Sequence, residues 1–308
     1  MAPTAQLTQA QRPAVRRRER WWRIAAPYVF ISPFYILFLA FGLLPIVFSL
    51  VVSLYDWRGT TPGGFVGMQN YQVLLRDPTF YKSLLNTTYV WIGSVPPMIL
   101  LALVFAAILN SRFVRFRNLF RTVYFLPVVT SLVITGLVFG QLFSMSFGLV
   151  NSALEALGLP AFNWLNDPTW MKIILVLALL WRWTGNDMVI MLAGLQSIPN
   201  DLYEAARVDG ATDVQSFWHI TIPLMRPVIL FDAIISTIGT FNLFAEPYVL
   251  FGQGGAMNQA AVVTGTFLYQ NSFRYFKFGY ASAIAWVLAA IILALSMLQL
   301  KLGSREAA

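Results

Sequence analysis

Long apolar segments without charge recur along the chain, and they limit it to folds that cross a membrane. The first runs from Ile24 to Tyr55 and lacks a small-residue cleavage site after a short apolar core, so we interpret it as a retained span rather than a cleaved signal peptide. Crossing about 30 Å of hydrocarbon takes about 20 mostly apolar residues in a helix. Six segments reach that length, at about 25–54, 84–109, 122–143, 171–194, 228–250 and 279–300.

The composition agrees with this interpretation. The chain is 58% hydrophobic and only 11% charged, which makes it far more apolar than a soluble domain of 308 residues. The sequence therefore predicts an all-α polytopic membrane protein with six transmembrane helices.

The basic residues indicate how the spans are oriented. With six spans, both termini share a side with the second and fourth loops, and those segments carry most of the Lys and Arg residues, among them Arg16-Arg17-Arg18. Cytoplasmic loops are the ones enriched in Lys and Arg, so both termini are predicted to be cytoplasmic. We expect a multi-pass protein of a bacterial or archaeal cytoplasmic (inner) membrane, with residues 1–23 as a disordered basic tail and residues 24–303 as the transmembrane domain.

The same distribution explains the formal net charge of +8. Basic residues beside a span set the topology and contact anionic lipid, and no folded basic surface accompanies them. Membrane lipid is therefore an expected partner, whereas nucleic acid is not.

Several kinds of chemistry are excluded by what the sequence lacks. It has no cysteine and a single histidine, His219, so thiol catalysis and a histidine-based metal cluster have no residues to use. No phosphate-binding loop of the G-x-x-x-x-G-K-[ST] type is present either. We expect no metal, no cofactor and no enzyme activity in this chain; if it uses ATP, another subunit binds it.

The fourth loop, about 197–223, differs from the others because it carries ordered helix signals. Pro199 suits the first turn of a helix, and Asp201 and Glu204 have the spacing of a capping box. Gly210 stands where a helix ends with a positive φ. Thr212 and Gln215 form a second capping box, and Pro223 and Pro227 are expected to interrupt that second helix before the fifth span. The loop is thus predicted to be two short helices joined by a sharp turn.

The polar face of this loop points to a protein partner. A helix that rests on lipid carries Lys and Arg on its polar face, but here Glu204 and Asp209 are acidic. Ala205 and Ala206 allow a partner to approach closely. The external loops are less decisive: their Trp, Tyr and Phe residues fit either an aromatic belt at the membrane interface or a docking surface for an external partner.

These residues resemble a known motif. Glu204-Ala205-Ala206, Gly210 and Ile220-x-Ile222-Pro223 are similar to the EAA loop of binding-protein-dependent ABC importer permeases, although Ile222 stands where that family usually has Leu. The segments before and after the loop also match the sugar-importer branch, the MalF, LacF and UgpA type permeases. Further matches occur in the first external loop, the second span and the C-terminal segment Phe278–Ala283, so the resemblance covers about residues 28–300.

The resemblance implies a type I ABC importer fold and a set of partners. One partner is a second permease subunit, which is usually a different chain, so that the two permeases form a heterodimer. The others are two cytoplasmic ATPase subunits that bind ATP and Mg, an extracytoplasmic solute-binding protein and a sugar. It also implies that the EAA loop sits in a cleft of the ATPase and transmits its closure. The residues expected to couple this chain to the ATPase are Glu204, Ala205, Ala206, Asp209, Gly210, Ile220 and Pro223.

Polar and aromatic residues inside two spans mark a candidate sugar path. Buried polar side chains in a span are costly and usually face the protein interior or a water-filled path. The fourth span contributes Arg182, Trp183 and Asn186, and the resemblance implies substrate contacts from this span and the fifth. The candidates in the fifth span are Phe241, Asn242, Phe244 and Glu246. An alternative is that Arg182 and Glu246 form an ion pair that only holds the helices together.

Two questions stay open at this stage. An ion-coupled secondary transporter could use Asp187 and Asp232, although such carriers usually have an internal repeat, and none is visible. The sugar could be an oligosaccharide, a monosaccharide or a sugar phosphate. Arg182 in the path favours an anionic sugar, and Glu246 nearby favours a neutral one.

Overall fold

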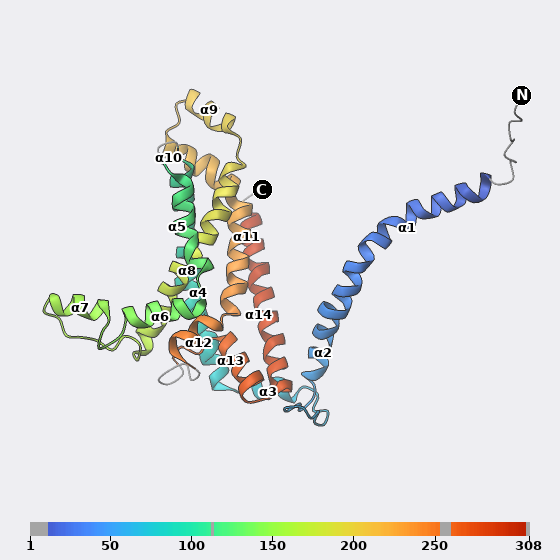
Figure 1. Cartoon of the computed structure of the whole chain (residues 1–308), viewed down its shortest axis with the longest axis horizontal. Helices are drawn as coiled ribbons and strands as arrows, with labels where there is room; N and C mark the ends of the chain where they lie inside the picture. The colour runs from blue at the N-terminus through green and yellow to red at the C-terminus, as the bar shows by residue number, and fades with distance from the viewer. Residues whose placement is uncertain (1–11, 112–113, 253–259, 306–308) are drawn as a thin grey trace, which may run out of the picture.

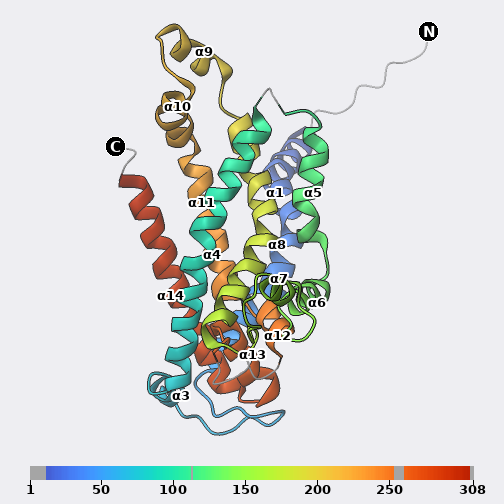
Figure 2. The ribbon, with the colours of Figure 1, turned by 90° about the vertical axis from the view of Figure 1, so that its left-hand side faces the viewer.

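The computed structural model describes residues 12–111, 114–252 and 260–305 of the chain, and these residues form an all-α membrane protein. Within them, five helices are long and apolar enough to cross a membrane, and a bent pair makes a sixth span if its two halves are counted together. The prediction of six spans is confirmed in that form. The central helices are α4 (Pro78–Asn110), α8 (Pro168–Gln196), α11 (Ile222–Phe241) and α14 (Phe278–Arg305), which run side by side in Figures 1 and 2.

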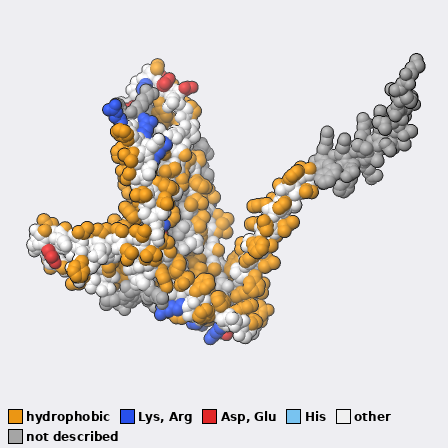
Figure 3. Space-filling model, viewed as in Figure 1, with side chains coloured by type: hydrophobic (Ala, Val, Ile, Leu, Met, Phe, Trp, Pro, Cys, Tyr) orange, Lys and Arg blue, Asp and Glu red, His pale blue; other side chains and the backbone are white. Residues whose placement is uncertain are grey.

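The first span stands apart from this bundle (Figure 1). It consists of α1 (Arg12–Phe38), a π-helical turn (Leu39–Leu43) and α2 (Leu44–Val52). Only 6% of its apolar window is buried, and hydrophobic side chains cover it in Figure 3. The chain alone therefore leaves this span for lipid or another subunit to cover.

The N-terminal tail differs from its predicted disorder. Since α1 begins at Arg12, residues 12–23 are helical, which is consistent with the high helix propensity of Arg and Glu in this stretch and with a proline in the first turn. Residues 1–11 lie outside the described part of the chain.

The third span is broken, and the prediction of one helix over 122–143 is wrong in this respect. Helix α5 (Arg117–Val129) and helix α6 (Leu132–Leu142) meet at 94°. Thr130 has an extended backbone, and the Ser131 hydroxyl then accepts a hydrogen bond from the Val133 amide at 3.3 Å, which caps α6. Helix α6 and the following α7 (Leu149–Ala156) consequently project sideways from the bundle (Figure 1).

The fifth span also ends earlier than the predicted 228–250. Helix α11 stops at Phe241, and a short helix, α12 (Ala245–Phe251), follows after a break. Helix α13 (Thr264–Tyr269) packs against this break: the Thr264 hydroxyl donates a hydrogen bond of 2.7 Å to the Phe241 carbonyl. A Cβ on Gly265 would overlap with the backbone of Leu243, so the close approach depends on that glycine.

Helix α8 is the centre of the packing. It makes its most extensive contact with α4, and residues of both helices belong to one buried cluster that includes Ala102, Ala106, Met188 and Met191. Helix α5 lies on its other side, where a Cβ on Gly185 would overlap with the backbone carbonyl of Tyr124. The candidate path residues of α8 are therefore held by two rigid neighbours.

Candidate functional site

The predicted coupling loop, about 197–223, forms two short helices at the end of the molecule where α1 begins and α14 ends (Figures 1 and 2). Helix α9 spans Asn200–Val208, and helix α10 spans Asp213–Ser216. None of the residues of α9 is buried, and Val208 is 88% exposed. The loop is thus presented to solvent with its backbone ordered.

The end of α9 has the geometry that the sequence predicts. Gly210 has φ +82°, and its amide donates to the Arg207 carbonyl at 3.1 Å while the Ala211 amide donates to the Ala206 carbonyl at 2.9 Å. This pair of bonds is the Schellman motif, which satisfies the last carbonyl groups of a helix. The sharp turn therefore has a fixed geometry that depends on a left-handed residue.

The two predicted capping boxes have different outcomes. Thr212 and Gln215 cap α10 reciprocally, as expected. The box between Asp201 and Glu204 is wrong: α9 begins after Pro199, whose ring has no hydrogen-bonding side chain, so both carboxyl groups lie inside the helix instead of at its cap. Glu204 is left exposed and free for another role.

The expected interruption by proline is also wrong. Helix α10 continues through a π-helical turn, Phe217–Thr221, directly into α11. Pro223 lies in the first turn of α11, directly after the π-helical turn, and Pro227 is accommodated inside that helix. The Tyr203 and Thr221 hydroxyl groups are 2.8 Å apart. Together these features connect the loop rigidly to the fifth span.

A shallow groove of about 420 Å³ lies between α9 and the turn into α11. It brings together four of the seven predicted coupling residues: Ala206, Asp209, Gly210 and Ile220. The other three lie outside it. Glu204 and Ala205 are exposed on α9, and Pro223 is exposed at the start of α11.

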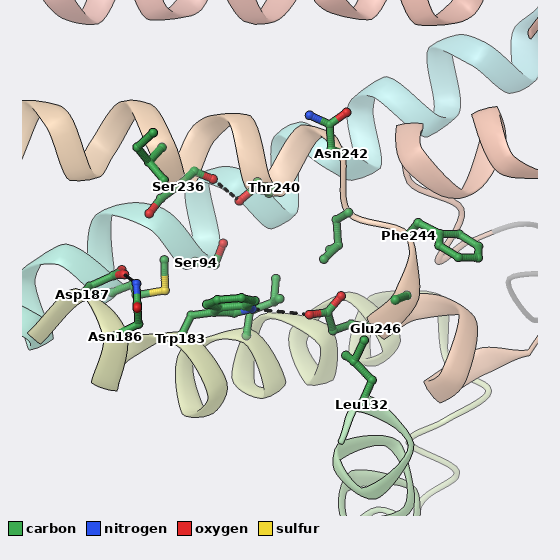
Figure 4. A pocket seen from close by; sticks show the side chains of 16 residues that line it. Ser94, Leu132, Trp183, Asn186, Asp187, Ser236, Thr240, Asn242, Phe244 and Glu246 are labelled. Carbon is green, nitrogen blue, oxygen red and sulfur yellow. Dashed lines mark hydrogen bonds between the residues drawn. The ribbon is translucent and has the colours of Figure 1, made fainter. Parts of the chain in front are cut away.

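The second candidate site is a cavity of about 470 Å³ inside the bundle (Figure 4). It is bounded by α4, α6, α8, α11 and the break before α12. Five of the predicted path residues line it: Trp183, Asn186, Asn242, Phe244 and Glu246. Its other polar lining residues are Ser94, Asp187, Ser236 and Thr240.

The interactions within the cavity wall fix several of these side chains. The Trp183 indole nitrogen donates to Glu246 Oε1 at 3.4 Å, and Asn186 donates to Asp187 Oδ1 at 3.2 Å. The Phe244 ring stacks on Tyr269 with centroids 3.9 Å apart. Trp183 is thus the aromatic side chain that lies along the middle of the cavity, as Figure 4 shows.

Two predicted path residues do not line the cavity. Phe241 is buried, and its ring lies 6.3 Å from that of Trp91. Arg182 is directed toward the break in the third span, where its Nη1 donates to the Thr130 carbonyl at 3.0 Å and to the Thr135 hydroxyl at 3.1 Å. Its Nε lies 3.8 Å from Glu246 Oε1. The geometry of Arg182 is therefore that of an ion pair joining helices.

Sequence reasoning missed Ser94, Ser236 and Thr240 and did not place Asp187 in the path. A signal was available for α11, because Asp232, Ser236 and Thr240 recur at intervals of four and so share one helix face. Asp232 itself is buried but does not line the cavity. For Ser94 on α4, no comparable pattern marks the residue.

Comparison with known proteins places the chain among transport permeases. The lactose transport system permease protein LacF of Rhizobium radiobacter is 41% identical over 276 residues, which cover 88% of this chain and 92% of that protein. The arabinooligosaccharides transport system permease protein AraP of Bacillus subtilis (strain 168) is 40% identical over 282 residues, which cover 91% of this chain and 88% of AraP.

A solved structure has the same fold. It is the crystal structure of a bacterial alginate ABC transporter in complex with an alginate pentasaccharide-bound periplasmic protein, in which one chain matches with a TM-score of 0.79 and 25% identity. The match covers 94% of this chain and 98% of that one. Residues 98–305, from the middle of α4 to the end of α14, match the family described as binding-protein-dependent transport system inner membrane component. The chain therefore belongs to this family, whose members are multi-pass transport subunits of the inner membrane and not enzymes.

Proposed function

We propose that this chain is the permease subunit through which an ABC importer moves a sugar inward, driven by ATP hydrolysis on a separate subunit. The observation that carries the proposal is the combination of a polar, aromatic cavity inside the bundle with relatives of about 40% identity named for lactose and arabinooligosaccharides. None of the relatives reported above is named as an ion-coupled carrier, so a secondary-transport mechanism receives no support.

The sugar passes through the cavity between α4, α8 and α11. The apolar face of a sugar ring packs against an aromatic ring, and its hydroxyl groups need polar partners. Trp183 supplies the aromatic face, and Asn186, Asn242 and Glu246 supply polar groups around it. Phe244 closes the outer end, where it stacks on Tyr269. Arg182 acts behind the wall by holding Glu246 in place.

The loop α9–α10 couples this cavity to the ATPase. A ligand or partner shifts a conformational equilibrium only through contacts that differ between the two states. Here the groove residues Ala206, Gly210 and Ile220 receive the ATPase surface, and Glu204 and Asp209 pair with basic residues on it. Because α10 runs without a break into α11, a displacement of the loop moves the helix that lines the cavity. ATP and Mg are bound by the ATPase and not by this chain.

The remaining partners follow from the same assignment. A solute-binding protein delivers the sugar on the side of α3 (Gln69–Leu74), α12 and α13. A second permease covers the first span, which this chain leaves almost unburied. The start of α1, the coupling loop and the end of α14 lie at one end of the molecule, which supports a cytoplasmic position for both termini.

The test is affinity purification of the chain in detergent from its native membrane, followed by an ATPase assay on the eluate. We expect a second permease and an ATPase to co-purify, with ATP hydrolysis stimulated by one binding protein and its sugar. A chain that elutes alone and transports sugar without ATP would contradict the proposal.

A further inference from the structure

The charges around the cavity distinguish the kinds of sugar that it can accept. Its described lining residues include two carboxyl groups, Glu246 and Asp187, and neither Lys nor Arg. Arg182 is the cation next to this wall, but its guanidinium is directed to Thr130 and Thr135 and does not line the cavity. Arg182 offsets the charge of Glu246 through their ion pair, but no basic side chain lines the cavity beside Asp187. An anion next to Asp187 would therefore face an acidic group without a cation in the described lining.

The hydrogen-bonding capacity of the wall has the same bias. Both contacts of Glu246 with neighbouring side chains involve Oε1, which leaves Oε2 as an acceptor. Asp187 is buried, its Oδ1 accepts from Asn186, and its Oδ2 has no hydrogen-bond partner among the described residues. Because Oδ2 is enclosed in the wall, Asp187 acts on a ligand through its negative charge, whereas Glu246 Oε2 can accept a hydrogen bond from it.

Part of the donor capacity of the wall, in contrast, is already engaged. The indole N–H of Trp183 is donated to Glu246, and Asn186 and Asn242 each donate an amide N–H, to Asp187 and to the Ile238 carbonyl respectively. A hydroxyl group both donates and accepts, an ammonium group only donates, and an ionised carboxylate, sulfonate or phosphate only accepts. The Glu246 carboxylate can only accept, so this part of the wall suits ligands that carry hydroxyl or ammonium donors.

We propose that this cavity selects uncharged or amino sugars and excludes acidic ones, with Glu246 and Asp187 as the residues that set this preference. This inference rests on the proposed sugar-transport function and specifies its substrate class. An acidic group would bring a further negative charge close to Asp187 and no hydrogen-bond donor for Glu246. The alginate importer that shares this fold carries an acidic polysaccharide, so the preference is a property of this cavity and does not follow from the fold.

The test compares three disaccharides of one shape on the assembled complex of both permeases and the ATPase, without binding protein and without ATP. The probes are cellobiose, its acidic counterpart cellobiouronic acid and the β-1,4-linked glucosamine disaccharide. Saturation-transfer NMR suits the weak binding expected of a transport site. We expect the neutral and the amino disaccharide to bind at least about tenfold more tightly than the acid, a difference of about 1.4 kcal/mol. Equal or tighter binding of the acid, or no binding of cellobiose, would overturn the proposal.

Two variants assign the preference to the cavity wall. Asp187→Asn removes one carboxyl group and is expected to raise binding of cellobiouronic acid relative to cellobiose severalfold. The matched control, Ser94→Ala, removes a polar group of the neighbouring helix α4 from the wall without a change of charge and is expected to leave the ratio unaltered. An unchanged ratio in Asp187→Asn would overturn the role of the carboxyl groups. Glu246 is less suitable as the first variant, since its removal leaves Arg182 buried without its ion pair.

The proposed function fails separately from this inference. ATP-dependent uptake by the same complex, reconstituted with its binding protein, is measured with labelled lactose, maltose and arabinotriose alongside the three probes. Absence of any ATP-dependent sugar uptake would contradict the importer assignment. Uptake that favours the acidic disaccharide would leave that assignment intact and overturn only the proposed substrate class.

Discussion

Replacement of Gly210 tests whether the left-handed turn after α9 is what makes the coupling loop rigid. Gly210 has φ +82°, and a Cβ added there would meet no heavy atom within 4 Å. The space around it therefore permits a side chain, and the cost of a substitution comes from the backbone alone. For an ordinary L-residue that cost is about 1–2 kcal/mol, whereas Asn adopts this conformation more readily.

The expected order of the variants follows from this cost. Gly210→Asn is expected to resemble the natural chain, Gly210→Ala to lose about 1–2 kcal/mol from the native turn, and Gly210→Val to lose more because β-branched residues are genuine outliers at positive φ. A loss of 1–2 kcal/mol lowers the population of an ordered state relative to its alternatives by roughly 5-fold to 30-fold. Coupling should decline in the same order.

The assay is the ratio of sugar uptake to ATP hydrolysis in proteoliposomes, with size-exclusion chromatography in detergent as the control for insertion and assembly. We expect a normal ratio for Gly210→Asn, a reduced ratio for Gly210→Ala and a ratio near zero for Gly210→Val. Normal coupling in Gly210→Val would refute the requirement for a left-handed residue. If Gly210→Asn were as impaired as Gly210→Val, contact of the side chain with a partner, and not the backbone, would be the cause.

Three further variants probe the packing, the ion pair and the path. Gly185→Ala is expected to destabilise the chain by about 3 kcal/mol, because its Cβ would overlap with the Tyr124 carbonyl. The melting temperature in detergent measures this loss. The control is Gly140→Ala, whose Cβ would meet nothing and which should leave the melting temperature unchanged or slightly raised. Arg182→Gln leaves Glu246 buried without its ion pair and should lower the stability of the chain by about 3–5 kcal/mol. Adding Glu246→Gln should restore part of that stability. No recovery in the double variant would contradict the pairing. Asn242→Ala should weaken sugar uptake by roughly threefold to tenfold, which corresponds to the loss of one hydrogen bond, while ATPase binding stays intact. Unaltered uptake kinetics would exclude Asn242 from the path.

Features that depend on local rules were predictable from the sequence. The apolar runs locate the spans, because their length is set by the thickness of the bilayer. Gly210 and the box between Thr212 and Gln215 depend on residues only a few positions apart, so the turn and the start of α10 follow from composition and spacing.

Features that depend on contacts between distant segments were not predictable. The fifth span ends at Phe241 because Thr264 and Gly265, more than twenty positions later, pack against that point. The same holds for Arg182, whose partners Thr130 and Thr135 become accessible only because the third span bends between them. Hydropathy detects neither event, since the residues at both breaks are apolar or neutral.

The measurement that tests the central claim most directly is cross-linking from the coupling loop. The chain has no cysteine, so Val208→Cys at the exposed end of α9 introduces a unique site for a photoreactive maleimide in membranes that retain transport. Leu157→Cys, exposed after α7 at the opposite side of the proposed membrane, is the matched control. We expect Val208→Cys to cross-link to an ATPase subunit with a yield that changes when ATP is added, and Leu157→Cys to give no such product. Cross-links from Val208→Cys to lipid alone, or an ATPase cross-linked from Leu157→Cys, would contradict the account.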